Sequence, residues 1–208
     1  MNTYDWKEFL TEYSANLLKD PLLERRARIP EYARSSTWLG FPPAADQDIF
    51  DAEERLQIKL PPSLKAFYMV SNGWAVAGNF INSILPVEEI DWLRKLNPAL
   101  FELLREDSRS VFQICDTIIS KADVDVAANN YSSEEHGTLE ERVSRSILVS
   151  GDSDGDVLIL DAFAGDERGE WPGNIWNAWH PEENWNCDGF GGVFRQLRES
   201  YLSDPATD

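Results

Sequence analysis

The spacing of apolar residues predicts that the chain begins with a helix over residues 5–18. The apolar positions in this segment recur every three or four residues: Trp6, Phe9, Leu10, Tyr13 and Leu17. This interval places them along one face of a helix. We interpret the stripe as a contact with the protein's own core and not as a groove for a partner.

The pattern over residues 39–74 predicts two short helices joined by a tight turn. Apolar positions on one face of the first helix are Ile49, Ala52 and Leu56. Pro61 and Pro62 end this helix and begin the next, because proline suits a first helical turn. The second helix places one face toward the core, with Leu64, Phe67, Tyr68 and Ser71. Asn72-Gly73 is expected to end this helix, since glycine accepts the left-handed geometry of a helix end.

The same stretch carries a recognisable motif. It opens with LGFPPA from Leu39, continues with I-x-x-A-E-x-x-L around Ala52-Glu53, and ends with LPPSLKAFYxVSNGW from Leu60. This succession of an Ala-Glu helix, a Leu-Pro hinge, an aromatic helix and an Asn-Gly end resembles the start of the SMI1/KNR4 (SUKH) domain family. The similarity weakens through the middle and returns near the Trp-rich region and the final helix.

The resemblance has implications for fold and function. It implies an α+β fold and, as in most bacterial members, an immunity role in which the protein neutralises a toxin. Fungal relatives instead regulate cell-wall synthesis and signalling. Composition and periodicity alone indicate neither role.

Strand signals dominate the C-terminal half. Residues 146–150 and 157–161 are apolar runs separated by an acidic turn, which predicts a β-hairpin. A third strand is expected between Glu170 and Trp176, and a short one over residues 84–87. Apolar spacing predicts a closing helix from Phe190 to Tyr201. We therefore expect an α+β fold with a mixed β-sheet and helices packed mainly on one side.

The length of 208 residues is compatible with a single domain over 1–208. We expect an N-terminal helical arm over about residues 1–37 and a core over about residues 38–204. The polar segment 123–141 is interpreted as a loop or insertion. Two readings of it stay open, a binding loop on a rigid scaffold and a passive surface loop.

The net charge of −18 limits the kinds of macromolecule that the protein can bind. Such a surface repels the phosphates of nucleic acids, so we expect no nucleic-acid partner. It permits a basic protein partner, although an acidic balance also serves solubility alone. The N-terminus lacks a basic start followed by an apolar run, and no stretch approaches the ~20 apolar residues of a membrane helix. We therefore expect a cytoplasmic protein without a membrane partner.

Candidate chemistry is sparse. The segment Asp152–Asp156 has the composition of a calcium loop, but glycine is fourth in it and not sixth as in an EF-hand. The cysteines and histidines lack the spacing of a zinc site, and no phosphate-binding or nucleophile motif occurs. We expect no metal, no cofactor and no catalysis. A hydrolase is the less favoured alternative, and it would require buried carboxylates with strongly shifted pKa values in a deep pocket.

Exposed acidic turns and tryptophans are the candidate partner-binding groups. Tryptophans serve cores and loops first, protein interfaces second and sugar platforms third. The candidates are Asp152, Asp154, Asp156, Asp166, Glu167, Glu134, Glu135, Trp176 and Trp179. The expected function is that of an immunity protein that binds a cognate bacterial toxin, and the alternative is a regulatory scaffold of the SMI1/KNR4 type.

Overall fold

The computed structural model describes residues 5–19, 29–78, 81–106, 139–151, 156–176 and 185–203. Its helices and strands follow in the order α1 (Trp6–Leu17), α3 (Glu31–Ser36), α4 (Asp46–Leu56), α5 (Pro62–Tyr68), β1 (Asp91–Trp92), α6 (Leu93–Leu96), α7 (Pro98–Glu106), α11 (Leu139–Ser144), β2 (Ser146–Leu148), β3 (Val157–Asp161), β4 (Gly173–Trp176), β5 (Trp185–Cys187) and α12 (Phe190–Ser203).

The strands form a five-stranded sheet in the order β1-β2-β3-β4-β5. The predicted hairpin is confirmed, with Ile147 of β2 opposite Leu160 of β3. The α+β class is also confirmed, but the sheet is not the mixed one that was expected, because each described pairing is antiparallel. From β2 to β5 each strand pairs with the next one in the sequence, and the chain direction reverses from one strand to the next.

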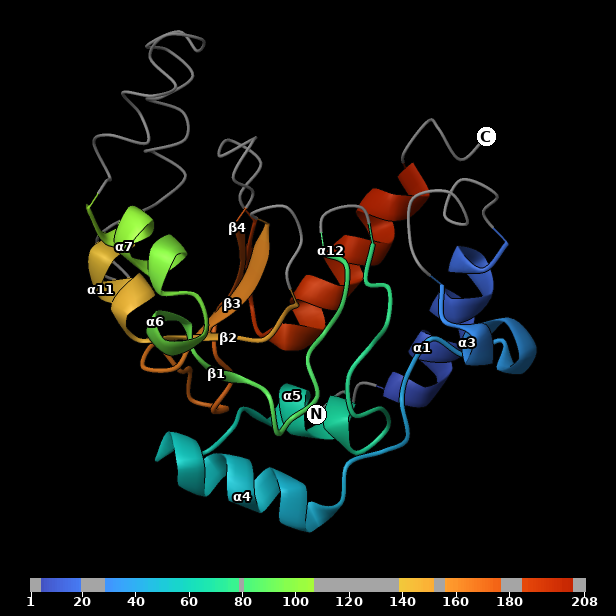
Figure 1. Ribbon diagram of the computed structural model, residues 1–208, viewed down its shortest axis with the longest axis horizontal. Coiled ribbons are helices and arrows are strands. Elements are labelled where there is room, and N and C mark those ends of the chain that lie inside the picture. The colour runs from blue at the N-terminus through green and yellow to red at the C-terminus, as the bar shows by residue number, and fades with distance from the viewer. Residues whose placement is uncertain are drawn as a thin grey trace, which may run out of the picture.

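Both faces of the sheet are covered by helices. Leu158 and Leu160 of β3 join a larger cluster that includes buried residues of α1, α4, α5 and α12. The alternating residues Val157 and Ile159 join a smaller cluster with residues of α6, α7 and α11. Figure 1 shows α7 and α11 on one side of the strands and α12 on the other. Helices were expected mainly on one face of the sheet, and the larger cluster lies on such a face. The helices α6, α7 and α11 on the other face were not expected.

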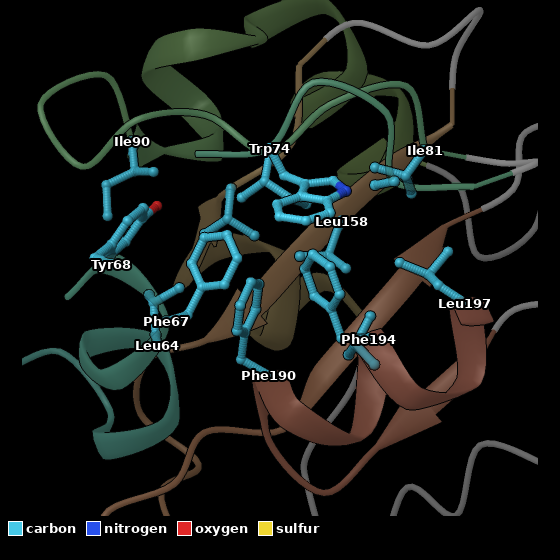
Figure 2. Close-up of a cluster of buried hydrophobic side chains, with 14 of the residues drawn as sticks. Leu64, Phe67, Tyr68, Trp74, Ile81, Ile90, Leu158, Phe190, Phe194 and Leu197 are labelled. Atoms are coloured by element: carbon cyan, nitrogen blue, oxygen red, sulfur yellow. The ribbon is translucent and has the colours of Figure 1, made fainter. Parts of the chain in front are cut away.

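Aromatic rings from three distant segments meet at the centre of the larger cluster. The ring centroid of Phe67 in α5 lies 5.1 Å from that of Phe190 and 5.3 Å from that of Phe194 in α12. Trp6 of α1 lies 5.3 Å from Phe67. Figure 2 shows Phe67, Phe190 and Phe194 converging beside Trp74. Such ring pairs add about 0.5–1.5 kcal/mol each beyond the burial of their area.

Helix α1 is part of this core. The Trp6 Nε1–H donates to the Ser63 carbonyl at 3.1 Å, and the Tyr13 hydroxyl donates to the Ala77 carbonyl at 2.9 Å. Burial raises the pKa of Tyr13, so its hydroxyl stays protonated as a donor. The interpretation of the N-terminal apolar stripe as a core contact is confirmed.

Two local predictions are wrong. The segment 84–87 is not a strand, because Ile84 forms only isolated bridges to Trp74 and Ser150, and Pro86 has no N–H to extend a ladder. Helix α5 ends at Tyr68, before Asn72-Gly73. The expected loop over 123–141 lies outside the described residues, apart from its last three positions at the start of α11.

The turn at Gly73 provides a test of the fold. Gly73 has φ +102°, and an added Cβ would lie 2.9 Å from the Ile84 carbonyl oxygen. Gly73→Ala should lower the free energy of unfolding by about 1–2 kcal/mol or more, measured by urea denaturation. Gly165→Ala is the matched control, since its Cβ would make only ordinary contact, 3.4 Å from Trp171. Equal stability of the two variants would contradict the assignment.

Candidate protein-binding surface

The predicted partner-binding residues do not form one patch in the described structure. Asp156 is half-buried just before β3, whereas Asp166 and Glu167 are exposed in the turn after it. The length of β3 therefore separates them. Five further candidates lie outside the described residues: Asp152, Asp154, Glu134, Glu135 and Trp179.

Trp176 does not present its ring to a partner. It is 6% exposed and belongs to the smaller cluster, together with Ile159 and Val143. Its position in β4 points it toward the second helical layer, which the sequence did not predict. Trp176 was expected to contact a partner, and it is instead a core residue.

Asp166 shapes its own turn. Its Oδ1 accepts from the backbone N–H of Glu170 at 2.9 Å and of Arg168 at 2.8 Å, and its Oδ2 accepts from the Arg168 guanidinium at 2.6 Å. The Glu170 N–H, followed by the contacts with Arg168, holds the pKa of Asp166 below its usual value. Glu167 is left as the exposed carboxylate of this turn.

The Ala-Glu pair of the motif ties α4 to α5. Glu53 is 8% exposed, and its carboxylate accepts from the Leu60 N–H at 3.0 Å, from Lys59 at 2.6 Å and from Lys65 at 3.3 Å. Burial raises the pKa of Glu53, but the hydrogen bonds from Lys59, the Leu60 N–H and Lys65 outweigh it and hold that pKa below its usual value. Ala52 is fully buried beside it. This part of the motif therefore holds the hinge between the helices.

The Asn-Gly end of the motif holds the turn over residues 86–90. The Asn72 side chain accepts from the Val87 N–H at 2.8 Å and donates to the Glu88 carboxylate at 2.8 Å. From α4, Arg55 Nη2 donates to the carbonyls of Val87 at 3.1 Å and Ile90 at 2.9 Å. These bonds fix the turn against α4 and leave Glu88 and Glu89 exposed.

A groove of about 550 Å³ lies between this turn and the segment that precedes α4. It is lined by Phe41, Pro42, Pro43, Asn72, Ser83, Ile84, Leu85, Pro86, Glu88 and Glu89. The outer face of α4 is exposed at Asp46, Phe50 and Glu54. We call this groove and the outer face of α4 together the α4 surface. It combines apolar and acidic groups, which suits contact with another protein.

The buried carboxylates of the described residues hold the fold together. Glu53 pairs with lysines, Asp91 pairs with Lys95, and Asp161 forms a bidentate pair with Arg145 at 2.7 and 2.8 Å. Each carboxylate contacts a basic side chain, whereas a hydrolytic pair requires two carboxylates that share a cleft. Glu53, Asp91 and Asp161 are therefore explained as structural ion pairs.

Within the described ranges no three His, Cys, Asp or Glu side chains gather as a metal site would require. Burial, and then the nearby Asp188, raise the pKa of the Cys187 thiol to about 11, so it stays protonated at neutral pH. The helices that the structure describes include none long and apolar enough to cross a membrane.

Comparison with protein families identifies the chain. A model of the SMI1/KNR4 family (SUKH-1) matches residues 43–194. The chain belongs to the SMI1/KNR4 family. The matched range begins just before α4 and ends within α12, so it contains the motif from Pro43 onward, the sheet and most of the α4 surface. This family is generally non-enzymatic and comprises immunity and regulatory proteins. A comparison with curated protein sequences found no match.

Sequence analysis missed the residues that line the α4 surface. Glu88 and Glu89 were not among the candidate residues, and they lie in a turn that Asn72 holds. A signal was present in α4, where Phe50 interrupts an otherwise polar outer face. An aromatic residue on the polar side of an amphipathic helix indicates a contact beyond the protein's own core.

The Glu53 network predicts a pH-dependent stability. Because Glu53 has a lower pKa in the folded protein, its contribution is present above the pKa of an unfolded glutamate, about 4.3. That contribution is lost as pH falls through the folded value. Glu53→Gln should lower the free energy of unfolding by about 1.5–3 kcal/mol at neutral pH, and this difference should shrink in acid. Urea titrations followed by tryptophan fluorescence measure both values.

The exposed neighbour Glu54 gives the control for this prediction. Glu54→Gln removes the same charge one position along α4 and should change stability by less than about 0.5 kcal/mol. If the Glu53 and Glu54 variants unfold alike at both pH values, the Glu53 network does not hold the hinge.

Proposed function

We propose that this protein is an immunity protein that binds a cognate bacterial toxin and neutralises it by direct contact. Membership of the SMI1/KNR4 family over residues 43–194 is the observation that carries the proposal. Binding covers the toxin's active site or a surface that the toxin needs. The protein contributes no chemistry of its own in this proposal, and the affinity comes from the interface.

The net charge of −18 supports a basic partner. Toxins that act on nucleic acids or nucleotides carry positive surfaces that attract their substrates, and an acidic inhibitor is attracted by the same field. Such steering raises the rate of association more than it lowers the rate of dissociation. It is also screened by salt, because the Debye length is about 8 Å at physiological ionic strength.

Co-expression tests the function. The product of the adjacent gene, expressed alone, should arrest bacterial growth, and co-expression with this protein should restore it. The two proteins should also co-purify as a complex. If the neighbouring product binds without being toxic, and acts instead in signalling or cell-wall synthesis, the regulatory alternative replaces the immunity role.

The acidic turn before β3 predicts a kinetic effect. Replacing Asp152, Asp154 and Asp156 together with asparagine should slow association with the toxin and leave the melting temperature unchanged. The effect should shrink at high salt, because long-range attraction is screened. Surface plasmon resonance at two ionic strengths measures both rates. If neither rate changes, the acidic segment 152–156 takes no part in association, and recognition lies elsewhere.

A further inference from the structure

We infer that the α4 surface is a docking site for a basic segment of a partner protein that also carries apolar side chains. This inference rests on the proposed function, since it names the surface and the kind of partner through which neutralisation would occur. In this inference the partner contacts the outer face of α4 and the groove beside it, and not the segments on either side of β3.

The α4 surface is held in place by contacts between α4 and the rest of the protein. Ile49, Ala52 and Leu56 bury the inner face of α4 in the larger cluster, and Arg55 joins its last turn to the carbonyls of Val87 and Ile90. Figure 1 shows α4 at the edge of the molecule, beyond α5. A surface that is already ordered loses little conformational entropy when a partner binds.

The positive groups near this surface are engaged within the fold. Arg55 donates to backbone carbonyls, while Lys59 and Lys65 donate to the buried Glu53. The negative groups, in contrast, are exposed to solvent: Asp46, Asp48, Asp51, Glu54, Glu88 and Glu89. Lys59 nevertheless stays 75% exposed, and its Nζ lies 5.7 Å from the centre of the Phe50 ring. The exposed carboxylates outnumber the cations, so the outward charge is negative and complementary to lysine and arginine side chains.

Exposed apolar groups are interspersed among these carboxylates. Phe50 is 45% exposed on the outer face of α4, and Phe41, Pro42 and Pro43 line the groove. The aliphatic stems of lysine and arginine pack on such groups while their charged ends reach carboxylates. Phe50 therefore adds an exposed apolar group to the acidic face of α4.

A second exposed aromatic pair does not suit the same partner. Phe163 is 65% exposed and stacks on Trp92 at 6.1 Å. The Arg94 guanidinium lies 5.6 Å from the Trp92 ring, and Lys95 is exposed beside it. Arg94 and Lys95 are both exposed beside this pair, whereas exposed carboxylates outnumber the cations around Phe50. The α4 surface therefore fits the basic partner better.

The dimensions suit a short segment. Helix α4 has 11 residues and a length of about 16 Å at 1.5 Å per residue. An extended chain of about five residues spans the same distance. The natural probe is therefore a short peptide in which arginine and leucine alternate, with a glutamate–leucine peptide as its charge-reversed control.

A titration of the full chain, followed by NMR of its backbone amides, tests the inference. The arginine–leucine peptide should shift signals from residues 41–43, 46–54 and 83–89 in a saturable way, and the glutamate–leucine peptide should not. Phe50→Ala combined with Glu54→Gln should weaken binding by about fivefold or more, which corresponds to a loss of about 1 kcal/mol. Equal shifts over every acidic surface, or no saturable shift, would overturn the inference.

A matched variant separates this surface from the turn after β3. Phe163→Ala combined with Glu167→Gln also removes one exposed aromatic ring and one exposed carboxylate, and it should leave peptide binding unchanged. If it weakens binding as much as the α4 variant does, the α4 surface is not the docking site. Melting temperatures equal to wild type show that both variants are folded.

The adjacent gene product distinguishes this inference from the proposed function. If that protein is bound by the wild type and equally well by the α4 variant, the surface is wrong and the function stands. If it is not bound at all, while the peptide still maps to α4, the function is wrong and the surface stands. Loss of toxin binding in the α4 variant alone supports both.

Discussion

The packing of α5 is the constraint on which the rest of the structure depends. A helix of seven residues is not stable alone in water, so contacts from distant parts of the chain must hold it. The Glu170 carboxylate accepts from the Ser63 N–H at 2.9 Å and from its hydroxyl at 2.5 Å, which satisfies the start of the helix. Phe67 is enclosed by the rings of Trp6, Phe190 and Phe194. Helices α1, α5 and α12 therefore stabilise one another.

The position of α5 also determines where α4 lies. Glu53 reaches from α4 to the hinge residues Lys59 and Leu60 and to Lys65 in α5, so α4 follows the packed helix closely. Asn72, beyond the other end of α5, holds the turn that presents Glu88. The SMI1/KNR4 motif thus fixes α4, α5 and the turn over residues 86–90 relative to one another. The α4 surface lies on the outer side of these elements. Residues that are characteristic of the family hold the site in place, while exposed neighbours would make the contacts.

The residues that fix the α4 surface differ from those exposed on it, so mutations in the two sets should have different effects. Changes in the motif residues that fix these elements, such as Glu53 or Gly73, act on the free energy of unfolding. Changes at Phe50 or Glu54 act on a partner and leave the core intact, because these side chains point to solvent. A binding protein can therefore alter its specificity on the outer face of α4 without losing its fold.

The pattern of apolar residues determined the local elements, because α1 and α4 repeat them at the helical interval and β2 and β3 are short continuous apolar runs. The motif also determined the family. Tertiary structure alone decided that Trp176 is buried and that Glu88 lies on the rim of a groove. Each outcome depends on a segment distant in sequence: Trp176 meets helices that precede β2, and Glu88 bonds Asn72, 16 positions earlier. Local periodicity carries no information about which distant surfaces meet, since that is settled only when the whole core packs.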